Sequence, residues 1–573
     1  MKKYVALAVF LTIAGLGFRL FLALHLPTDE PDDGRLYARI AINVLRHRSY
    51  SIETEEPYSP TLIRVPGYPL FMAGVYAVFG HDNNRAVRVI QAGLDTITCW
   101  LIALLALAWS PVGWDRRKRR RLLLIALALA VSCPFPAIYV TTILTETFTT
   151  LLVSACVLAA TLALRSESSR KSAMLWVGAG LLGGAATLFR SDSGLFVAAG
   201  GMTLVLVGLS RAVAHWRKPA LLPNTGRLVL ARTFTNGAML TIGFAGALAP
   251  WTIRNARVFG VFQPIAPQGA NMPGEFVPLG YTGWLRTWVD DAKYTESMEF
   301  PLDVGQLHIE KAPDYAFDSP EEREQVAALL ERYNHPASAE AQQTQPQPVP
   351  APDPKSKDST SGSKEPSASS SGNPDEEAPE EVESSDQDED EADPDADAEE
   401  TNQPGEMTPE IDAGFAEIAR ARIDRHPLRY YLIVPLKRAS SLWFDTHSQY
   451  YPFQGELLPL SALDTDIHQQ YWLPVFAFLT FLYTGIGLAG GWLLWREKRS
   501  RRWLLLLVLL IIPRLAFLSS MENPEPRYAV EFFVFVIAAG SLSFLDFIWD
   551  RLRKLARNWL RPVEQTKADS TQR

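Results

Sequence analysis

Residues 4–38 read YVALAVFLTIAGLGFRLFLALHLPTDEPDDGRLYA, an apolar run that ends in a cluster of acidic residues. The run from Tyr4 to Leu26 is long enough to cross a bilayer as one helix. Arg19 interrupts it and no small-residue cleavage site follows, which favours a retained helix over a signal peptide. An unpaired carboxylate inside a bilayer costs about 2.5 to 3.5 kcal/mol. The acidic cluster in residues 29–33 is therefore predicted to lie at a water-exposed membrane surface.

Apolar windows of similar length recur along the chain and predict an all-α polytopic membrane protein with about ten spans. The windows are residues 4–26, 85–109, 122–140, 147–164, 173–188, 194–209, 234–251, 471–495, 503–519 and 528–549. A shorter apolar segment, residues 66–80, contains two prolines and predicts a helix lying at the interface.

The charge is distributed very unevenly. Residues 375–400 contain 16 Asp and Glu and no Lys or Arg, so the formal charge of −8 becomes +8 (−8 + 16) without them. The remaining basic residues are concentrated in short loops, a pattern that sets membrane topology rather than one that binds nucleic acid. The basic loops are residues 116–121, 165–171, 211–232, 496–502 and 551–561.

With ten spans, all these loops fall on one side, which the positive-inside rule assigns to the cytoplasm. Both termini are then cytoplasmic, and the acidic loop of residues 29–84 faces outward. The turns at residues 141–146 and 189–193, the segment 254–470 and the loop 520–527 are expected on that same outer side.

Composition divides the chain into six predicted parts. Residues 336–403 are rich in Pro, Ser, Gln, Asp and Glu, so they are expected to form a disordered linker. The parts are 1–265, a membrane catalytic module; 266–335, an outer loop region; 336–403, the acidic linker; 404–470, an outer interfacial helix and aromatic segment; 471–549, C-terminal spans; and 550–573, a cytoplasmic basic tail.

Two features of the chain have ordinary structural interpretations. Cys99, Cys133 and Cys156 lie inside apolar segments without short spacing, so they are expected to be buried small hydrophobes and not a zinc site or a disulfide framework. Thr408 precedes apolar residues at helical spacing, which predicts a helix packing on the membrane domain.

Charged residues cluster at the predicted outer ends of the spans and form the candidate site. Asp32 or Asp33 would cap the helix that begins near Gly34; such a carboxylate stays ionised, as a general base must, although simple capping explains it equally well. Glu146, Arg190 and Asp192 follow in two turns, where a structural ion pair is the alternative interpretation.

Arginines at the same ends would suit a phosphate group. Arg64, Arg254 and Arg527 present guanidinium groups that hold phosphate by forked hydrogen bonds, although Arg254 or Arg527 alone could be a membrane anchor. No metal ligand is proposed from the sequence and no cofactor is required by it, while a divalent metal stays open. The residues expected to bind substrate are Tyr37, Arg64, Tyr68, Arg190, Asp192, Arg254, Asn255, Arg527 and Tyr528.

The order and sidedness of these motifs resemble a known enzyme class. They are Asp33 with Tyr37, Arg64-Val65-Pro66-Gly67-Tyr68-Pro69, Leu144-Thr145-Glu146-Thr147, Leu188-Phe189-Arg190-Ser191-Asp192 and Pro250-Trp251-Thr252-Ile253-Arg254-Asn255. They look like the GT-C integral-membrane glycosyltransferases, most similar to the bacterial branch of protein O-mannosyltransferases and aminoarabinose transferases (family 39-like). The resemblance covers residues 1 to 265 and, less fully, the last three spans.

The resemblance implies an inverting transfer of a sugar from a polyprenyl-phosphate donor to a protein, lipid or glycan, on the outer face of a bacterial inner (plasma) membrane. It also implies an acidic catalytic residue in the first outer loop, which the spacing to Tyr37 and Ala38 matches to Asp33, then to Asp32. The acidic pair of the family could instead be Asp29-Glu30. Glu146 is the third candidate in the catalytic set.

Two other functions stay open from the sequence. A transporter or flippase of a lipid-linked envelope precursor would show internal repeats and broken polar helices, and no repeat is evident here. A sensor or assembly protein that docks through its acidic insert would fail when residues 336–403 are deleted, whereas an enzyme would largely tolerate that deletion.

Overall fold

The computed structural model describes residues 2–26, 32–216, 225–267, 269, 271–302, 304–336, 405–445 and 467–549. Within these ranges the chain is helical and contains no strand, which confirms the predicted all-α class. Predictions about Asp29 and Glu30, the tail 550–573, and the acidic linker apart from Pro336 fall outside the described residues.

Nine of the described helices are long and apolar enough to cross a membrane, which indicates an integral membrane protein. They are α1 (Lys2–His25), α4 (Asn84–Trp109), α7 (Glu146–Arg165), α8 (Ser169–Phe189), α9 (Gly194–Trp216), α10 (Thr225–Phe259), α16 (Ile467–Arg496), α17 (Arg501–Ser519) and α18 (Val530–Ser543) with its flanking turns.

The predicted span at residues 122–140 is bent. α5 (Arg116–Ser132) is followed by α6 (Pro134–Ala137) and η1 (Ile138–Val140). The helix axis bends by 52° between α5 and the segment formed by α6 and η1. Pro134 and Pro136 lack the N–H groups that would continue the helix of α5. If the bent pair counts as one span, the described helices give up to ten.

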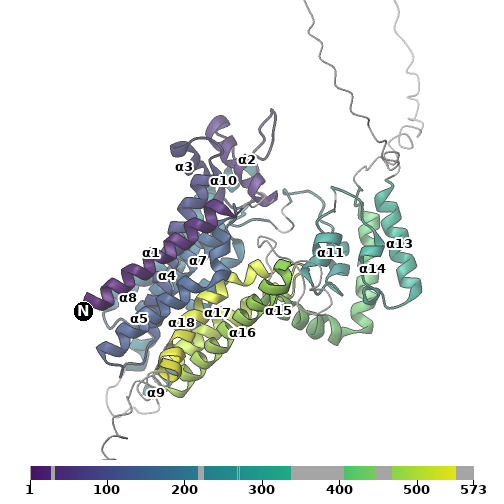
Figure 1. Cartoon of the computed structure of the whole chain (residues 1–573). Coiled ribbons are helices and arrows are strands. Elements are labelled where there is room, and N and C mark those ends of the chain that lie inside the picture. Colours follow the sequence, from purple (N-terminus) through teal and green to yellow (C-terminus); the bar gives the residue numbers. More distant parts are fainter. Residues whose placement is uncertain are drawn as a thin grey trace, which may run out of the picture.

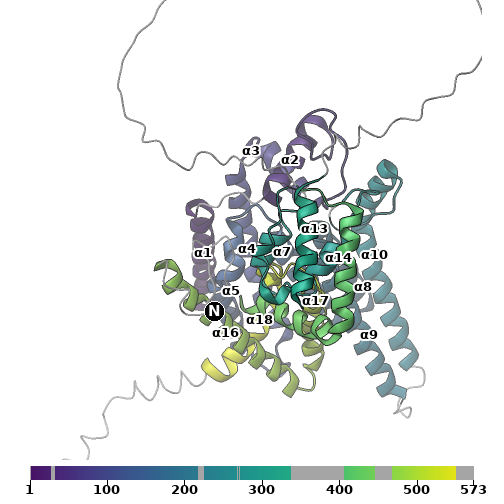
Figure 2. The ribbon, with the colours of Figure 1, turned by 90° about the vertical axis from the view of Figure 1, so that its right-hand side faces the viewer.

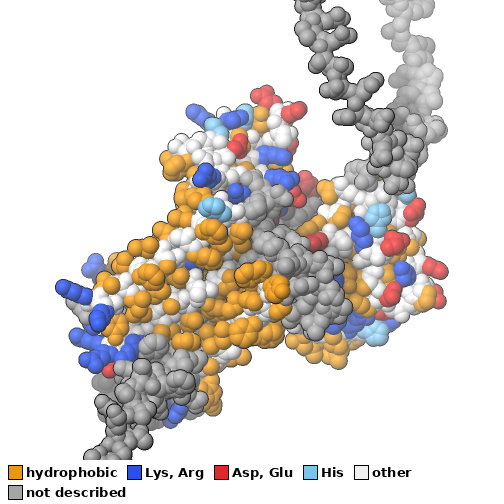
Figure 3. All heavy atoms as spheres, viewed as in Figure 1, with side chains coloured by type: hydrophobic (Ala, Val, Ile, Leu, Met, Phe, Trp, Pro, Cys, Tyr) orange, Lys and Arg blue, Asp and Glu red, His pale blue; other side chains and the backbone are white. Residues whose placement is uncertain are grey.

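The long helices lie side by side in one bundle, with α16, α17 and α18 packed against the N-terminal helices (Figure 1). α18 is at its centre, because every residue from Val530 to Ser543 is buried. Hydrophobic side chains cover much of the bundle surface in Figure 3, while Lys and Arg gather at the end where the chain begins. An apolar surface bounded by charge at the helix ends is what a bilayer requires.

Two shorter helices cover one end of the bundle. α2 (Asp32–His47) packs on α3 (Gly67–Phe79), and α3 has 13 residues, too few to cross a bilayer. A Cβ at Gly67 would lie 2.6 Å from the carbonyl oxygen of Leu188, so only glycine allows α3 to begin against the end of α8. This contact brings the segment before α3 next to Arg190.

A second group of helices forms a separate unit beside the bundle, seen face-on in Figure 2. Its core contains Tyr281, Trp284, Trp288 and Phe415. α14 thus packs on α11 and α13 rather than on the membrane helices as expected, although the sequence placed 266–335 and 404–470 in different parts. The unit comprises α11 (Leu279–Leu285), α12 (Ala292–Met298), η4 (Ile309–Lys311), η5 (Asp314–Ala316), α13 (Pro320–Asn334) and α14 (Pro409–Arg425).

η6 (Arg429–Ile433) and α15 (Val434–Phe444) connect this unit to the bundle, and it is called the outer unit because it lies outside the bundle. Arg438 of α15 is buried and donates to the carbonyl oxygens of Val289 and Arg286, at 2.5 and 2.9 Å. Arg286 also forms a 2.5 Å ion pair with Glu522, in the loop after α17. The outer unit is therefore fastened to the same loop that leads to η8 (Pro526–Ala529), while η9 (Phe544–Trp549) follows α18.

Candidate functional site

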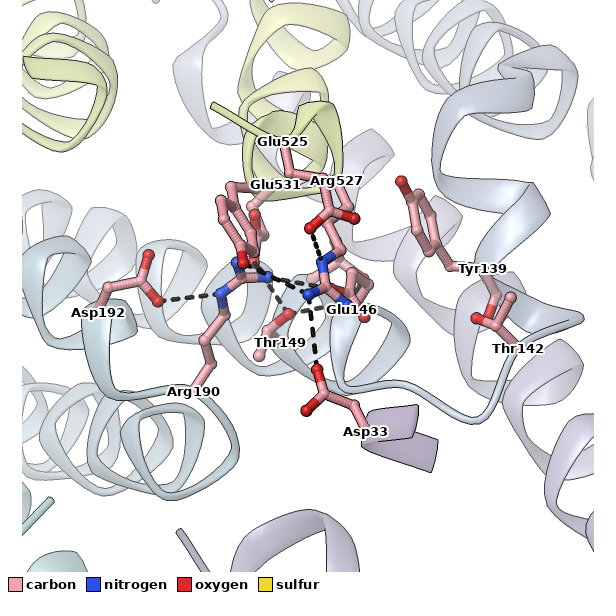
Figure 4. A network of polar contacts seen from close by, with 12 residues as sticks. Asp33, Tyr139, Thr142, Glu146, Thr149, Arg190, Asp192, Glu525, Arg527 and Glu531 are labelled. Atoms are coloured by element: carbon pink, nitrogen blue, oxygen red, sulfur yellow. Dashed lines mark hydrogen bonds and ion pairs between the residues drawn. The ribbon is translucent and has the colours of Figure 1, made fainter. Parts of the chain in front are cut away.

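Charged side chains from segments far apart in the sequence meet where α2 begins, and Figure 4 shows Asp33, Glu146, Arg190 and Arg527 among them. Arginines bridge carboxylates within two groups, one around Asp33 and one around Arg190. Tyr528 joins the two groups into one network, because its hydroxyl accepts from Arg527 at 3.4 Å and its ring lies under Arg190. Its members among the described residues are Asp33, Glu146, Asp192, Glu525 and Glu531, with Arg64, Arg190, Arg514 and Arg527.

Asp33 lies in the first turn of α2, between two arginines. Arg64 Nη2 donates to its Oδ1 at 3.1 Å, and Arg527 Nη2 lies 3.5 Å from its Oδ2. Burial raises the pKa of Asp33, but the positive charges of Arg527 and Arg64 outweigh burial and leave that pKa below its usual value. Asp33 is thus ionised, and its strength as a base depends on what those arginines bind.

α2 begins at Asp32, so Asp32 and Asp33 are both in the first helical turn rather than before it. The positive end of the helix dipole favours a carboxylate there. The two side chains differ in exposure: that of Asp32 is 99% exposed and 3.5 Å from Arg35, whereas that of Asp33 is 28% exposed. Only Asp33 contacts the network.

Glu146 opens α7 and faces Arg190, which follows the last residue of α8. Arg190 Nη1 donates to Glu146 Oε1 at 3.1 Å, while Arg190 Nε donates to Asp192 at the same distance. The second oxygen of Glu146 is buried and accepts no hydrogen bond from the described residues. A buried acceptor without a donor is unfavourable, so this oxygen has capacity for a substrate hydroxyl.

Arg514 and Glu531 hold the deepest part of the network together. Arg514 Nε donates to Asp192 at 2.9 Å and its Nη1 donates to Glu531 at 3.1 Å. The side chains of Arg514 and Glu531 are almost fully buried, whereas that of Asp192 is 13% exposed. Thr149 donates to the other Glu531 oxygen at 3.0 Å. These contacts fix η2 (Ser191–Ser193), α17 and α18 relative to α7.

Tyr528 and Tyr37 supply the aromatic walls of the site. The guanidinium of Arg190 lies 4.3 Å from the ring centre of Tyr528, and that of Arg527 lies 5.2 Å from the same centre. Tyr37 packs edge-on against Tyr68 at 5.2 Å. Burial and the charge of Asp33 raise the pKa of Tyr37, so Tyr37 remains a neutral hydroxyl beside the acidic groups. Tyr68 in turn donates to Gln91 at 2.6 Å.

Arg254 and Asn255 are occupied elsewhere. Arg254 Nη1 donates to the carbonyl oxygen of Thr61 at 2.7 Å and to Asn255 at 2.9 Å, and Asn255 donates to Gln263. These bonds tie α10 to the loop that carries Arg64. Neither Arg254 nor Asn255 contacts Asp33 in the described structure.

Sequence reasoning missed Arg514, Glu531 and Glu525. Arg514 and Glu531 lie inside windows that were identified as spans, and a charged residue inside an apolar window is itself a functional signal. Glu525 lies beside Arg527, and the two form a 2.7 Å ion pair.

No group of three or more His, Cys, Asp or Glu in the described ranges is arranged to hold a metal ion. Comparison of the chain with protein-family models, with curated proteins and with solved structures finds no match.

Proposed function

We propose that this chain is a membrane glycosyltransferase that moves a sugar from a polyprenyl-phosphate donor to an acceptor hydroxyl or amine. The observation that supports it most directly is the position of Asp33, a carboxylate between the guanidinium groups of Arg64 and Arg527. Two arginines that share one carboxylate are arranged to accept a phosphate in its place.

Donor binding activates Asp33 in this scheme. The phosphodiester of the donor takes over Arg64 and Arg527, so Asp33 loses the positive charges that depress its pKa. A carboxylate released from two cations accepts a proton more readily. The base is therefore active only when the donor is in place.

The transfer is a single displacement at the anomeric carbon. The acceptor oxygen or nitrogen forms a bond to that carbon while its proton goes to Asp33. The bond from the carbon to the phosphate oxygen breaks, and its electron pair stays on the polyprenyl phosphate, where Arg64 and Arg527 stabilise the charge. Attack opposite the leaving group inverts the configuration.

The rest of the network positions these groups. Glu146, with one free buried oxygen, accepts a hydrogen bond from the sugar. Arg190 and Arg514 keep Glu146 and Asp192 at their separation. We infer from the basic loops that this end of the bundle faces outward and that both termini are cytoplasmic. The resemblance to the glycosyltransferases implies that the membrane is a bacterial inner membrane.

Adjacent aspartates give a matched test. We expect Asp33→Asn to lower transfer about 10²- to 10⁴-fold, because a well-placed base contributes that much, and Asp32→Asn to stay within a few-fold of the wild type. The assay uses the purified full chain in vesicles with polyprenyl-phosphate mannose or aminoarabinose. Equal effects of the two substitutions would reject Asp33 as the base. Movement of the donor across the bilayer without release of polyprenyl phosphate would favour a transporter instead.

A further inference from the structure

A second polar site lies at the opposite end of the bundle. A cavity of about 120 Å³ is enclosed by α7, α8, α9 and α10. It lies beside Ser172, near the start of α8, whereas Arg190 follows the last residue of that helix. The 21 residues of α8 span about 30 Å at 1.5 Å per residue. The cavity is therefore separate from the network around Asp33.

The floor of this cavity carries buried polar groups. Asn236 Nδ2 donates to Ser172 Oγ at 3.2 Å, and both residues line the cavity. Trp176 also lines it, is fully buried, and has an indole N–H without an acceptor among the described residues. An unsatisfied buried donor is unfavourable, and an oxygen placed in the cavity would relieve it.

The rim of the cavity is positively charged. Arg211 and Arg232 both line it, and Arg232 Nη2 donates to the carbonyl oxygen of Ser166 at 2.7 Å. Arg165 and Arg211 are the charged groups that act on Arg502, whose Nε is buried without a partner in the described structure. All these neighbours have the same sign, so each repels the others.

The contrast with the other end of the bundle is informative. There, each arginine of the network has a carboxylate within 4 Å. Here, none of Arg165, Arg211, Arg232 and Arg502 forms an ion pair with any acid that the structure describes. Like charges gathered at a helix end, next to the unsatisfied indole N–H of Trp176, favour the binding of an anion.

The size of the cavity limits the anion. The cavity of about 120 Å³ is small against the roughly 300 to 1,000 Å³ of pockets that hold drug-sized ligands. A phosphate group fits this space, whereas a whole nucleotide or sugar phosphate does not.

We propose that this cavity binds the phosphate group of an anionic phospholipid. Exposed apolar residues on the helices that form it, Leu209 on α9 and Leu228 and Phe234 on α10, offer a surface for acyl chains next to the phosphate. Basic pockets between membrane helices bind anionic headgroups in this way. Free inorganic phosphate shares the chemistry and is the alternative source.

The test uses the full chain in nanodiscs of phosphatidylcholine with increasing phosphatidylglycerol, with retained lipid counted by native mass spectrometry. The site variant is Arg211→Gln with Arg232→Gln. Its matched control is Arg170→Gln with Arg227→Gln, which removes the same charge from exposed positions on α8 and α10 that do not line the cavity. Trp176→Phe removes the indole N–H together with part of the ring, and changes no charge.

We expect the site variant to bind phosphatidylglycerol about thirtyfold more weakly, roughly fivefold for each basic residue, and the control to bind as the wild type does. Trp176→Phe should weaken binding a few-fold. If the site variant retains phosphatidylglycerol as the wild type does and loses only the stabilisation of the fold by inorganic phosphate, the ligand is a free ion. That result would overturn the proposal for a lipid. If site variant and control lose lipid equally, or neither loses any ligand, the arginines only set topology and the proposal is wrong. If the site variant does not fold, unchanged binding by Trp176→Phe overturns the proposal.

Discussion

At the residue scale, Glu525 sets the net charge that the network offers to a donor. The described network contains four arginines and five carboxylates, which gives 4 − 5 = −1 when all are ionised. Burial raises the pKa of Glu525, and the charges of Arg527 and Arg190 offset only part of that increase. One proton on Glu525 makes the network neutral and releases Arg527 to bind phosphate.

This predicts that the donor binds more weakly as the pH rises through the pKa of Glu525. The protonated form predominates below that pKa, where Arg527 is available, and the charged form above it competes with the phosphodiester for Arg527. A phosphodiester keeps one negative charge over this range, so it adds no titration of its own. Donor affinity, measured as the pH is raised stepwise from below the usual range of a glutamate, should fall in the wild type and fall less in Glu525→Gln. The same slope in both proteins would contradict the prediction.

Between the residue and element scales, one buried ion pair joins α1 to α4. Arg19 Nε lies 2.5 Å from Asp95 Oδ2, the two side chains are 1% and 2% exposed, and Arg19 also donates to Cys99 at 3.1 Å. Loss of one partner leaves a buried charge without compensation, which costs about 3 to 5 kcal/mol.

A double-mutant cycle tests this coupling. Arg19→Met and Asp95→Leu should each lower the thermal stability of the detergent-solubilised chain strongly. The double variant should recover most of the loss, because apolar residues of similar size can replace a buried pair. Additive losses would show that the two charges do not stabilise each other.

At the element scale, glycines allow α8 and α10 to pack closely. A Cβ at Gly180 would lie 2.2 Å from the carbonyl oxygen of Leu240, and one at Gly243 would lie 2.3 Å from that of Val177. Small residues allow this approach between membrane helices, where packing replaces the hydrophobic effect. Gly178, on the same helix, has open space beside it.

Gly180→Leu should therefore separate the helices and destabilise the chain by more than about 3 kcal/mol, beyond the usual range for overpacking. Gly178→Leu is the control at a neighbouring position and should be tolerated. Melting temperatures of the two purified variants decide the matter, and similar values would contradict the close packing.

The elements themselves could be predicted from the sequence to very different degrees. Apolar windows locate nearly every span, because length and composition alone decide whether a helix suits a bilayer. The bend after α5 and the continuation of α10 through Pro250 to Phe259 depend on local proline geometry, which a window average hides. Residues 266–335 were predicted as a loop region because their short helices carry no long apolar period.

The residues of the candidate site could be predicted from the sequence where they lie near the ends of the spans. Asp33, Glu146, Arg190 and Arg527 all lie at or next to span ends that the sequence predicts on one side, so the predicted sidedness brings them to one surface. Arg514 and Glu531 required knowledge of which helices touch, and only the tertiary structure gives that. The contacts of Arg254 with Thr61 depend likewise on a loop path that residue spacing does not determine.

At the scale of the whole molecule, the outer unit holds the loop that leads to Glu525 and Arg527. Arg286 pairs with Glu522, and Thr295 donates to the Glu522 carbonyl oxygen at 3.0 Å. Glu299 lies at this junction, with one buried oxygen that has no partner among the described residues. Burial and the charge of Glu522 raise the pKa of Glu299 to about 8, against the opposing charges of Arg286 and Arg438.

The sign of the pH effect on docking follows from this shift. The pKa of Glu299 is higher in the folded chain, about 8 against 4.5, so the docked unit binds the proton more tightly. The proton on Glu299 stabilises the docked outer unit. This stabilisation is complete below about pH 4.5 and is lost as the pH rises through about 8, at about 1.4 kcal/mol for each pKa unit. Alkaline pH should therefore loosen the outer unit and, through Glu522, the loop at the candidate site.

Hydrogen exchange measured on the full chain tests this effect. After correction for the intrinsic exchange rate, protection in α11, α12 and the 520–525 loop should fall between about pH 6 and about pH 8.5 in the wild type. Glu299→Gln cannot ionise, so its protection should stay constant, whereas Glu310→Gln, an exposed position in the same unit, should follow the wild type. A fall of equal size in Glu299→Gln would show that another group controls docking. If protection falls in α11 and α12 but not in residues 520–525, the outer unit does not hold that loop, and the candidate site is assembled by the bundle alone.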